Sequence, residues 1–354
     1  MPRIKFQSLN TENLFLEDLK NNIAQYFTNK NIHKYGNSEM YFKCILWISL
    51  WGLSWYGIIY FKDSYLTSVS IGIFHMFCHL MIAFNIIHDA NHNAMFKSRK
   101  LNTFFGYFIE LLGSSRKMWI ESHNKEHHSS VNIHKHDNNI DGHGLLRLTP
   151  HDKWLPHHKF QWIYAPFVYS LSTINYATFR DFKLIFKSKK KKPFNFYAEF
   201  IFFKILYYSY LFIIPMFIFN VSFKILISYF LIGHLINGLI LSIIFIIGHL
   251  TEGTSYPDVN NNMVVQEDWA VHILKTTGDF ATNTKPLQWF VGGINLHIVH
   301  HLFPSICHVH YREVLKIIKE IASKHKIIYR EIPSFKLAFI SHFKLLKQLG
   351  KESI

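Results

Sequence analysis

The chain has 354 residues, of which 49% are hydrophobic, and its formal net charge is +15. A basic balance suits nucleic acid, anionic lipid or an anionic substrate, but long uncharged apolar stretches do not belong in a soluble nucleic-acid-binding domain. The cysteines Cys44, Cys78 and Cys307 form no C-x-x-C pair, so neither a disulfide framework nor a thiolate metal site is expected. The alternation of apolar and basic stretches indicates a membrane protein with sizeable aqueous portions.

The first hairpin is expected directly after a polar N-terminal segment, residues 1–43. Residues 44–61 carry no charge, and 64–87 are uncharged up to His88. A helix that crosses a bilayer needs about 20 such residues. Because only Lys62 and Asp63 separate the two runs, they are predicted to form an antiparallel pair of spans. Residues 44–354 are treated as one catalytic domain.

A second hairpin is predicted from residues 205–223 and 225–251, which are uncharged on either side of Lys224. Between the hairpins, residues 101–113 and 161–179 are also apolar. The second of these holds many polar groups and a proline, so it is expected to lie along the membrane interface and not to cross the bilayer. The shorter stretch at 101–113 is expected to lie in the same way. The predicted fold is therefore an all-α integral membrane protein, with four spans in two hairpins and a helical cap outside the bilayer.

The basic residues orient these spans. The two hairpin turns hold only Lys62 and Lys224 of the 38 Lys and Arg, which leaves 36 for the termini and the 93–204 loop. The positive-inside rule puts both termini and that loop in the cytosol. The run Lys189 to Lys192 is typical of a solvated or lipid-facing surface, with a CoA or phospholipid head group as the alternative contact.

Histidine is the unusual residue, with 24 copies gathered into clusters. Within each cluster the spacing includes i and i+4, which places the rings on one face of a helix. All three clusters fall on the predicted cytosolic side, where they are able to share one site. Their members are His88 and His92; His123, His127 and His128; and His297, His300 and His301.

Imidazole is a common ligand for iron, zinc, copper and nickel. A single such pair is more often an ordinary surface histidine, but three groups on one side of a membrane are harder to explain that way. Their number exceeds the needs of one tetrahedral zinc and suits two metal ions with partly open coordination. No H-E-x-x-H, G-x-S-x-G or Walker A motif occurs in the chain.

These motifs resemble the membrane fatty acid desaturases and their three histidine boxes. The resemblance is carried by HDANH at 88–92, W-I-x-S-H-N-x-x-H-H at 119–128, NIHKHDNNID at 132–141 and G-G-I-N-L-H-I-V-H-H-L-F-P at 292–304. It covers roughly residues 40–350 and is closest to the bacterial acyl-CoA and front-end branch. One departure is that His297 and Val299 stand where front-end enzymes usually have Gln and often Glu.

The resemblance implies an O2-dependent desaturase that introduces a cis double bond into the chain of an acyl-CoA or acyl lipid. Its cofactor would be two iron ions held by the eight box histidines and by His249 at the end of the fourth span. No catalytic side chain beyond the metal site is implied. Because no H-P-G-G motif occurs, electrons are expected from a separate ferredoxin, flavodoxin or free cytochrome b5 with its reductase. The membrane would be a bacterial inner membrane or the endoplasmic reticulum.

Other polar and aromatic residues are assigned by their distance from the boxes along the chain. Candidates to orient the ligands are Asp89, Asn124, Asp137, Asp141 and Asn295, and candidates to line a substrate tunnel are Trp119 and Trp269. His75, His79 and His234 lie within spans and are expected to make helix-packing hydrogen bonds. The remaining assigned histidines are expected at the surface or beside the ligands: His134, His136, His143, His151, His157, His158, His308, His310, His325 and His342.

Two other functions stay open from the sequence. A hydroxylase or ketolase would use the same scaffold and oxidant but leave oxygen on the carbon. A divalent-metal transporter is a more distant alternative, because transporters place their ligands near the middle of the membrane, whereas these clusters lie at helix ends and in cytosolic segments.

Overall fold

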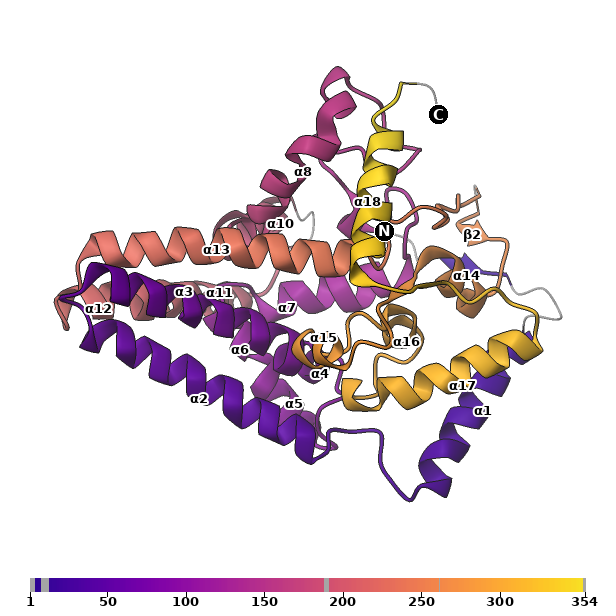
Figure 1. The fold of residues 1–354 in the computed structure, drawn as a ribbon, viewed down its shortest axis with the longest axis horizontal. Helices are drawn as coiled ribbons and strands as arrows, with labels where there is room; N and C mark the ends of the chain where they lie inside the picture. The colour runs from indigo at the N-terminus through magenta and orange to yellow at the C-terminus, as the bar shows by residue number, and fades with distance from the viewer. Residues whose placement is uncertain (1–3, 8–12, 188–190, 261, 353–354) are drawn as a thin grey trace. The chain divides into compact units, whose positions relative to one another are not determined.

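The structure is a computed structural model that describes residues 4–7, 13–187, 191–260 and 262–352, so Lys189 and Lys190 lie outside it. Its regular structure is almost wholly helical (Figure 1). Contacts divide the chain into two compact units. We call Met1–Gly36, Glu121–Pro166 and Ile243–Ile354 the histidine unit, and Asn37–Ile120 and Phe167–Ser242 the span unit.

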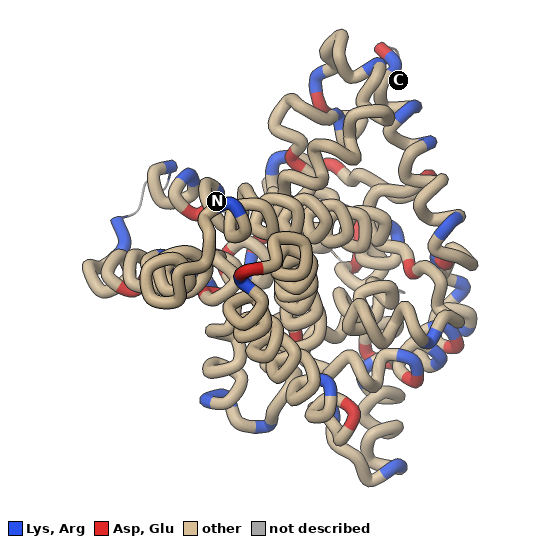
Figure 2. Tube along the Cα trace, turned by 60° about the vertical axis from the view of Figure 1, so that its left-hand side comes forward, with Lys and Arg blue, Asp and Glu red and all other residues tan. Residues whose placement is uncertain are grey.

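Four helices are long and apolar enough to cross a membrane. Figure 2 colours the charged residues along the chain and shows long tan stretches between them. The four helices cover Ser38–Tyr60, Tyr65–Asn91, Phe194–Phe217 and Phe223–Ile246. The predicted number of such helices and their order in two pairs along the chain are thus confirmed. The elements are α2 (Ser38–Tyr60), α3 (Tyr65–Ile82), η1 (Ala83–Ile87), α4 (His88–Asn91), α11 (Phe194–Tyr208), η7 (Ser209–Ile213), α12 (Ile214–Phe217) and α13 (Phe223–Ile246).

The predicted bounds of the third span, 205–223, are wrong. This helix begins at Phe194 and ends at Phe217. The prediction treated Lys204 as a charged boundary, but the structure buries this side chain. Its ammonium group donates to the carbonyl oxygens of Gly113 (2.5 Å) and Ala177 (2.8 Å), and it lies 3.6 Å from the Asp181 carboxylate. A lysine with these partners can stay inside an apolar helix.

The rest of the span unit consists of short helices from the loop between the hairpins. The apolar stretch at 161–179 is broken at Leu171 rather than continuous. That both apolar stretches lie along the membrane interface stays a prediction. The elements are α5 (Arg99–Gly106), α6 (Phe108–Leu111), α7 (Arg116–Trp119), α8 (Gln161–Ser170, which runs across the unit boundary), α9 (Ser172–Asn175), η6 (Tyr176–Arg180) and α10 (Asp181–Lys187).

Glycines allow close packing between the second and fourth spans. A Cβ atom on Gly72 would lie 2.3 Å from the ring of Tyr229, and one on Gly233 would lie 2.5 Å from Met76. Small residues let apolar helices approach closely where no water is available to drive their association. Tyr229 and Met76 belong to the apolar core of this unit.

The histidine unit combines helices with very short strands. Lys5–Phe6 (β1) pairs in parallel with Val264–Val265 (β2), and Asp279–Phe280 (β3) pairs in parallel with Glu331–Ile332 (β4). Its other elements are α1 (Asn13–Asn29), η2 (Ile120–Glu126), η3 (His127–Ser129), η4 (Asn138–Ile140), η5 (Pro156–Phe160), α14 (Trp269–Thr276), α15 (Lys285–Phe290), α16 (His297–Leu302), η8 (His308–His310), α17 (Tyr311–Lys324) and α18 (Phe335–Leu349).

The apolar core of the histidine unit lies among α1, α14, α16 and α17. Helix α17 contributes Val314 and Ile318, and α1 contributes Phe15 and Leu19, all with negligible exposure. These positions follow the helical spacing of an amphipathic face. The core holds α16, and with it the third histidine box.

Candidate metal centre

The third box is a short helix with two different faces. Ile298, Val299 and Leu302 of α16 are part of the apolar core. His297, His300 and His301 take the remaining positions, i, i+3 and i+4, so their rings share the other face. All three are fully buried. The pattern H-I-V-H-H-L therefore anchors the helix on one side and gathers imidazoles on the other.

The second box lies on a π-helix, not on the expected α-helix. The π-helix η2 covers Ile120–Glu126 and is followed by the 3-10 turn η3. Its i→i+5 hydrogen bonding brings the rings of both His127 and His128 close to the ring of His123. The Nε2 atoms of His123 and His128 are 3.3 Å apart. This wider helix accounts for three ligand candidates at i, i+4 and i+5.

His249 follows the fourth span directly and meets the third box. Helix α13 ends at Ile246, and His249 lies in the turn that follows. Its Nε2 atom is 2.8 Å from Nε2 of His297 and 3.1 Å from Nε2 of His301. A Cβ atom on Gly248 would lie 2.5 Å from the His297 ring. Glycine is thus required for the His297 ring to pack against this turn.

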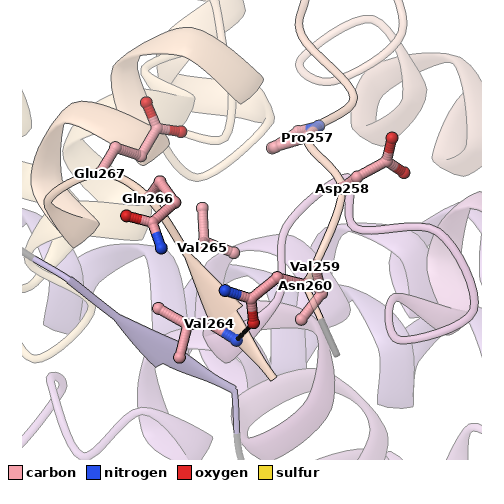
Figure 3. A pocket seen from close by; sticks show the side chains of 8 residues that line it. All are labelled: Pro257, Asp258, Val259, Asn260, Val264, Val265, Gln266 and Glu267. Carbon is pink, nitrogen blue, oxygen red and sulfur yellow. Dashed lines mark hydrogen bonds between the residues drawn. The ribbon is translucent and has the colours of Figure 1, made fainter. Parts of the chain in front are cut away.

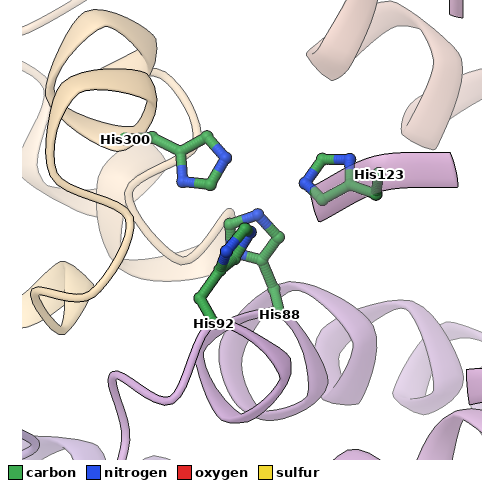
Figure 4. A group of neighbouring side chains, drawn as sticks. All are labelled: His88, His92, His123 and His300. Atoms are coloured by element: carbon green, nitrogen blue, oxygen red, sulfur yellow. The ribbon is translucent and has the colours of Figure 1, made fainter. Parts of the chain in front are cut away.

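Two groups of ligand atoms form inside the histidine unit. One nitrogen from each of His127, His249, His297 and His301 lies within 4.8 Å of the others, and the same holds for His128, His300 and His301. The rings of His123 and His300, drawn in Figure 4, stack with their centroids 5.9 Å apart. The second and third boxes and His249 thus converge, although up to 178 residues separate them.

The first histidine box lies at the C-terminal end of the second span, in the span unit. His88 begins α4, and His92 follows its last residue. Figure 4 shows both rings projecting from this one helix end. Their centroids are 4.9 Å apart, and the Trp119 ring lies against both, at 6.2 Å from His88 and 5.8 Å from His92. Nε of Arg116 donates to Oδ1 of Asn91 at 2.8 Å, which fixes the end of this helix.

Asp137 orients one of the ligand candidates. Both of its carboxylate oxygens lie 3.0 Å from Nδ1 of His127, which leaves Nε2 directed toward the other imidazoles. Burial opposes ionisation of this carboxyl group, but His127 and the backbone N–H of Asn139 outweigh it, so its pKa is lowered. A carboxylate that accepts the second N–H of a histidine fixes the tautomer and ring direction of a metal ligand.

Two residues that hold this region were not predicted from the sequence. The Nδ2 group of Asn132 donates to the carbonyl oxygens of His249 (3.1 Å), Thr276 (3.1 Å) and Ser255 (3.3 Å). His272 is fully buried, with Nε2 2.9 Å from the carbonyl oxygen of Val131. The only signal for Asn132 was its place at the start of the motif at 132–141. For His272 no motif gave a signal.

Burial favours the neutral form of two of the converging imidazoles, His249 and His301. The pKa of His249 lies well below its usual value because of burial and the neighbouring His297 and His127. Burial and the surrounding histidines lower the pKa of His301 in the same way. Neutral imidazole is the form that binds a metal ion.

The remaining predicted site residues have varied surroundings. Asp89 lies 3.6 Å from Nδ1 of His88, and Asn295 donates to the carbonyl oxygens of Phe280 and Ala281 ahead of the third box. Asn124 is partly buried on η2. Asp141 is exposed and accepts the backbone N–H of His143. Trp269 packs against the apolar core of the histidine unit.

The histidines outside the boxes fall into two groups. The prediction for the in-span histidines is confirmed, because His75, His79 and His234 make hydrogen bonds within the span unit. His158, His308, His310 and His342 are all buried rather than at the surface, so for these four only the alternative of a place beside the ligands stays a prediction. Three of them contact backbone carbonyl oxygens, His158 that of Gly144, His310 that of Tyr35 and His342 that of Leu250.

One surface pocket lies apart from these histidines. It has a volume of about 410 Å³ and is lined by residues 257–260 and 264–267 (Figure 3). The side chain of Asn260 accepts the backbone N–H of Val264 at 2.9 Å, which shapes the wall of the pocket. No imidazole lines it, so it is not part of the candidate metal centre.

The donor set fits a first-row transition metal such as iron. Two nitrogen ligands about 2.1 Å from one ion and at right angles to each other are about 3.0 Å apart. The Nε2 separations of 2.8 and 3.1 Å around His249 are close to this value. Neutral imidazoles, a carboxylate behind one of them and an apolar surround are what such a site needs.

Comparisons with known proteins agree with this geometry. The family model described as fatty acid desaturase matches residues 64–333. An sn-1 linoleoyl-lipid 6-desaturase from Synechocystis sp. is 30% identical over 361 residues, covering 99% of each chain. A protein of the same name from Arthrospira platensis is 28% identical, covering 95% of this chain and 92% of its own.

A third relative is an acyl-lipid (8-3)-desaturase from Physcomitrium patens. It is 27% identical, covering 98% of this chain and 74% of its own. The matched range contains all three histidine boxes and the turn with His249. On this evidence the chain is a membrane protein and an oxidoreductase that belongs to the fatty acid desaturase family.

Proposed function

We propose that this enzyme is an O2-dependent acyl-lipid desaturase with a two-iron centre. The observation that carries the proposal is the convergence of buried imidazoles from the second box, the third box and His249. Two iron ions bound there would supply, with O2, an oxidant strong enough to remove hydrogen from an unactivated methylene. No amino-acid side chain supplies such an oxidant by itself.

We assign the metal ligands to nine histidines. The histidine unit offers seven, and the first box in the span unit offers the other two. A count of nine imidazoles suits two ions that keep room for O2. The proposed ligands are His88, His92, His123, His127, His128, His249, His297, His300 and His301.

The task of the chain is to hold these rings and to exclude water. The Asp137 carboxylate accepts the second N–H of His127. The carbonyl oxygen of Thr276 lies 3.4 Å from Nδ1 of His249, where it favours the tautomer that leaves Nε2 for a metal. Ligands fixed in this way keep their geometry when the charge of the centre changes during turnover.

The substrate is an acyl chain, and we infer that a lipid carries it. The relatives from Synechocystis sp. and Arthrospira platensis are named for linoleoyl-lipid, and the one from Physcomitrium patens for acyl-lipid. Both termini and the metal centre are proposed to face the cytosol, in line with the basic residues outside the hairpin turns. Electrons would come from a separate carrier protein.

Expression in a host that lacks its own desaturase tests this function. New double bonds in membrane lipids, mapped by mass spectrometry, are expected with the wild-type chain and absent with His300→Ala. Hydroxylated chains instead of double bonds would indicate a hydroxylase. Metal analysis of the purified protein is expected to find two irons per chain. Loosely exchanging zinc or manganese without product would overturn the proposal.

A further inference from the structure

Helix α18 has an exposed side composed of apolar and cationic residues. Leu337 is 50% exposed and Ile340 is 38% exposed. Lys336, Lys344 and Lys347 are exposed on the same helix. No aspartate or glutamate occurs between Ile332 and Lys351. The helix is the yellow element at the C-terminal end of the chain in Figure 1.

An aromatic row runs along this exposed side. Phe335, Phe339 and Phe343 are four residues apart, with ring centroids 6.5 Å and 4.5 Å from each neighbour. The apolar surface continues onto the first residues of α8, which belong to the same unit. There Nζ of Lys347 lies 5.4 Å from the Trp162 ring, and Ile163 is 58% exposed.

Helix α17 provides a contrast within the same unit. Its exposed residues include Glu313, Lys316, Glu320 and Lys324, so both signs of charge are present. Its large buried side chains face the apolar core. A helix of this kind is suited to water. The exposed apolar residues and the single sign of charge on α18 need a different explanation.

The inner side of α18 is fixed to the metal-binding region. Nδ1 of His342 donates to the carbonyl oxygen of Leu250 at 2.7 Å, and the hydroxyl of Ser341 accepts the N–H of Glu252 at 3.0 Å. The Nε2 group of Gln161 donates to the carbonyl oxygen of Leu346 at 2.8 Å. The helix is therefore held against the turn that carries His249 and is not a loose tail.

We propose that the exposed side of α18 lies on an anionic phospholipid surface. Phenylalanine, leucine and isoleucine side chains would enter the boundary between head groups and acyl chains, and the lysines would reach the phosphates. Each lysine near an anionic surface strengthens such a contact. The contact connects the turn of His249 with the membrane surface where the acyl-lipid substrate resides. It relies on the membrane assignment and not on the iron chemistry.

The test uses the full-length chain in lipid nanodiscs, with a fluorophore on Ile340→Cys. The native cysteines are all buried, so the new thiol is the accessible one. Lipids brominated on the acyl chain quench a probe that enters the bilayer. Quenching is expected to be several-fold stronger than for the control Ser323→Cys, which is exposed on α17. Leu337→Cys is the second reporter if the first variant folds poorly.

Charge is tested with the triple variant Lys336→Gln, Lys344→Gln, Lys347→Gln. Mixed nanodiscs carry bromine either on phosphatidylglycerol or on phosphatidylcholine. The chain with its lysines should be quenched preferentially through phosphatidylglycerol, and the triple variant should lose this preference by on the order of tenfold or more. Equal quenching at positions 340 and 323 would overturn the proposal. So would protection of the probe only by an added acidic ferredoxin, which would make this side a protein-docking surface. Neither result would affect the proposed chemistry.

Discussion

The buried histidines within the spans and those of the candidate metal centre differ in the atoms that their rings face. Nδ1 of His75 lies 3.1 Å from both the Ser54 hydroxyl and the Trp51 carbonyl oxygen. His79 and His234 meet tyrosine hydroxyl groups. In all three, the hydrogen-bond partners are oxygen atoms, as expected for polar groups that join helices in a membrane.

In the metal centre, nitrogen faces nitrogen. Nε2 of His249 is near Nε2 of both His297 and His301. One hydrogen cannot satisfy three such atoms, and imidazoles that share a cation are expected to be arranged in this way. Burial is common to both kinds of histidine, whereas the type of atom that the ring faces distinguishes the candidate ligands from the in-span histidines. The predictions below test this distinction, from the largest expected effect to the smallest.

His301→Ala should abolish product. It removes an imidazole that belongs to both groups of ligand atoms in the histidine unit. Lipid profiling should find no new double bond, and the iron content of the purified protein should fall. The control is His143→Ala, whose side chain is 58% exposed. Wild-type product levels from His301→Ala would contradict the ligand assignment.

Asp137→Asn should weaken metal binding by roughly 10–100-fold, as is typical when the hydrogen-bond partner of a ligand is lost. The side chain at position 137 keeps its shape, but it no longer offers a charged acceptor to Nδ1 of His127. Iron retention against increasing chelator measures the effect. Asp141→Asn is the matched control, because that side chain is exposed and contacts the backbone N–H and the imidazole of the nearby His143. Equal effects of the two variants would exclude the role of Asp137.

Asn132→Gly should lower the free energy of unfolding by about 1–3 kcal/mol, because buried carbonyl groups lose their donor. Glycine tolerates the positive φ of 55° at this position, so the variant isolates the side chain. Thermal unfolding in detergent gives the stability, and chelator titration should show earlier loss of iron. Asn31→Gly, at φ 51° but exposed, should change neither.

Gly248→Ala should cost about 1–3 kcal/mol through overpacking. The new methyl group would lie 2.5 Å from the His297 ring, which must rotate or shift. Product formation should fall more than protein yield, because the displaced ring belongs to the metal centre. Gly52→Ala has nothing within 4 Å of the new atom and should keep full activity. Unchanged product from Gly248→Ala would indicate that His297 does not bind the metal.

His75→Phe should have the smallest effect, about 0.6 kcal/mol and at most about 1.7 kcal/mol, as measured for hydrogen bonds between membrane helices. It removes the bonds to Ser54 and Trp51 but no metal ligand. Product per folded protein should match the wild type. A complete loss of iron from this variant would erase the distinction between the two kinds of histidine.

The sequence predicted the four spans and the histidine clusters because both are local patterns. Uncharged runs and i, i+4 spacing require no knowledge of the fold. The start of the third span was wrong because Lys204 finds its partners far away in the chain, at Gly113 and Ala177. Asn132 and His272 were missed for the same reason, since their partners are backbone groups that only the folded chain brings near.

The π-helix at the second box makes this part of the chain sensitive to length. A π-helix contains one residue more per turn than the hydrogen bonding of an α-helix would allow. Deletion of Lys125, an exposed residue of η2, would return the segment to an α-helix. His127 and His128 would then follow His123 at i+3 and i+4 instead of i+4 and i+5. Evolution of this segment is thus freer to exchange its exposed side chains than to gain or lose a single residue.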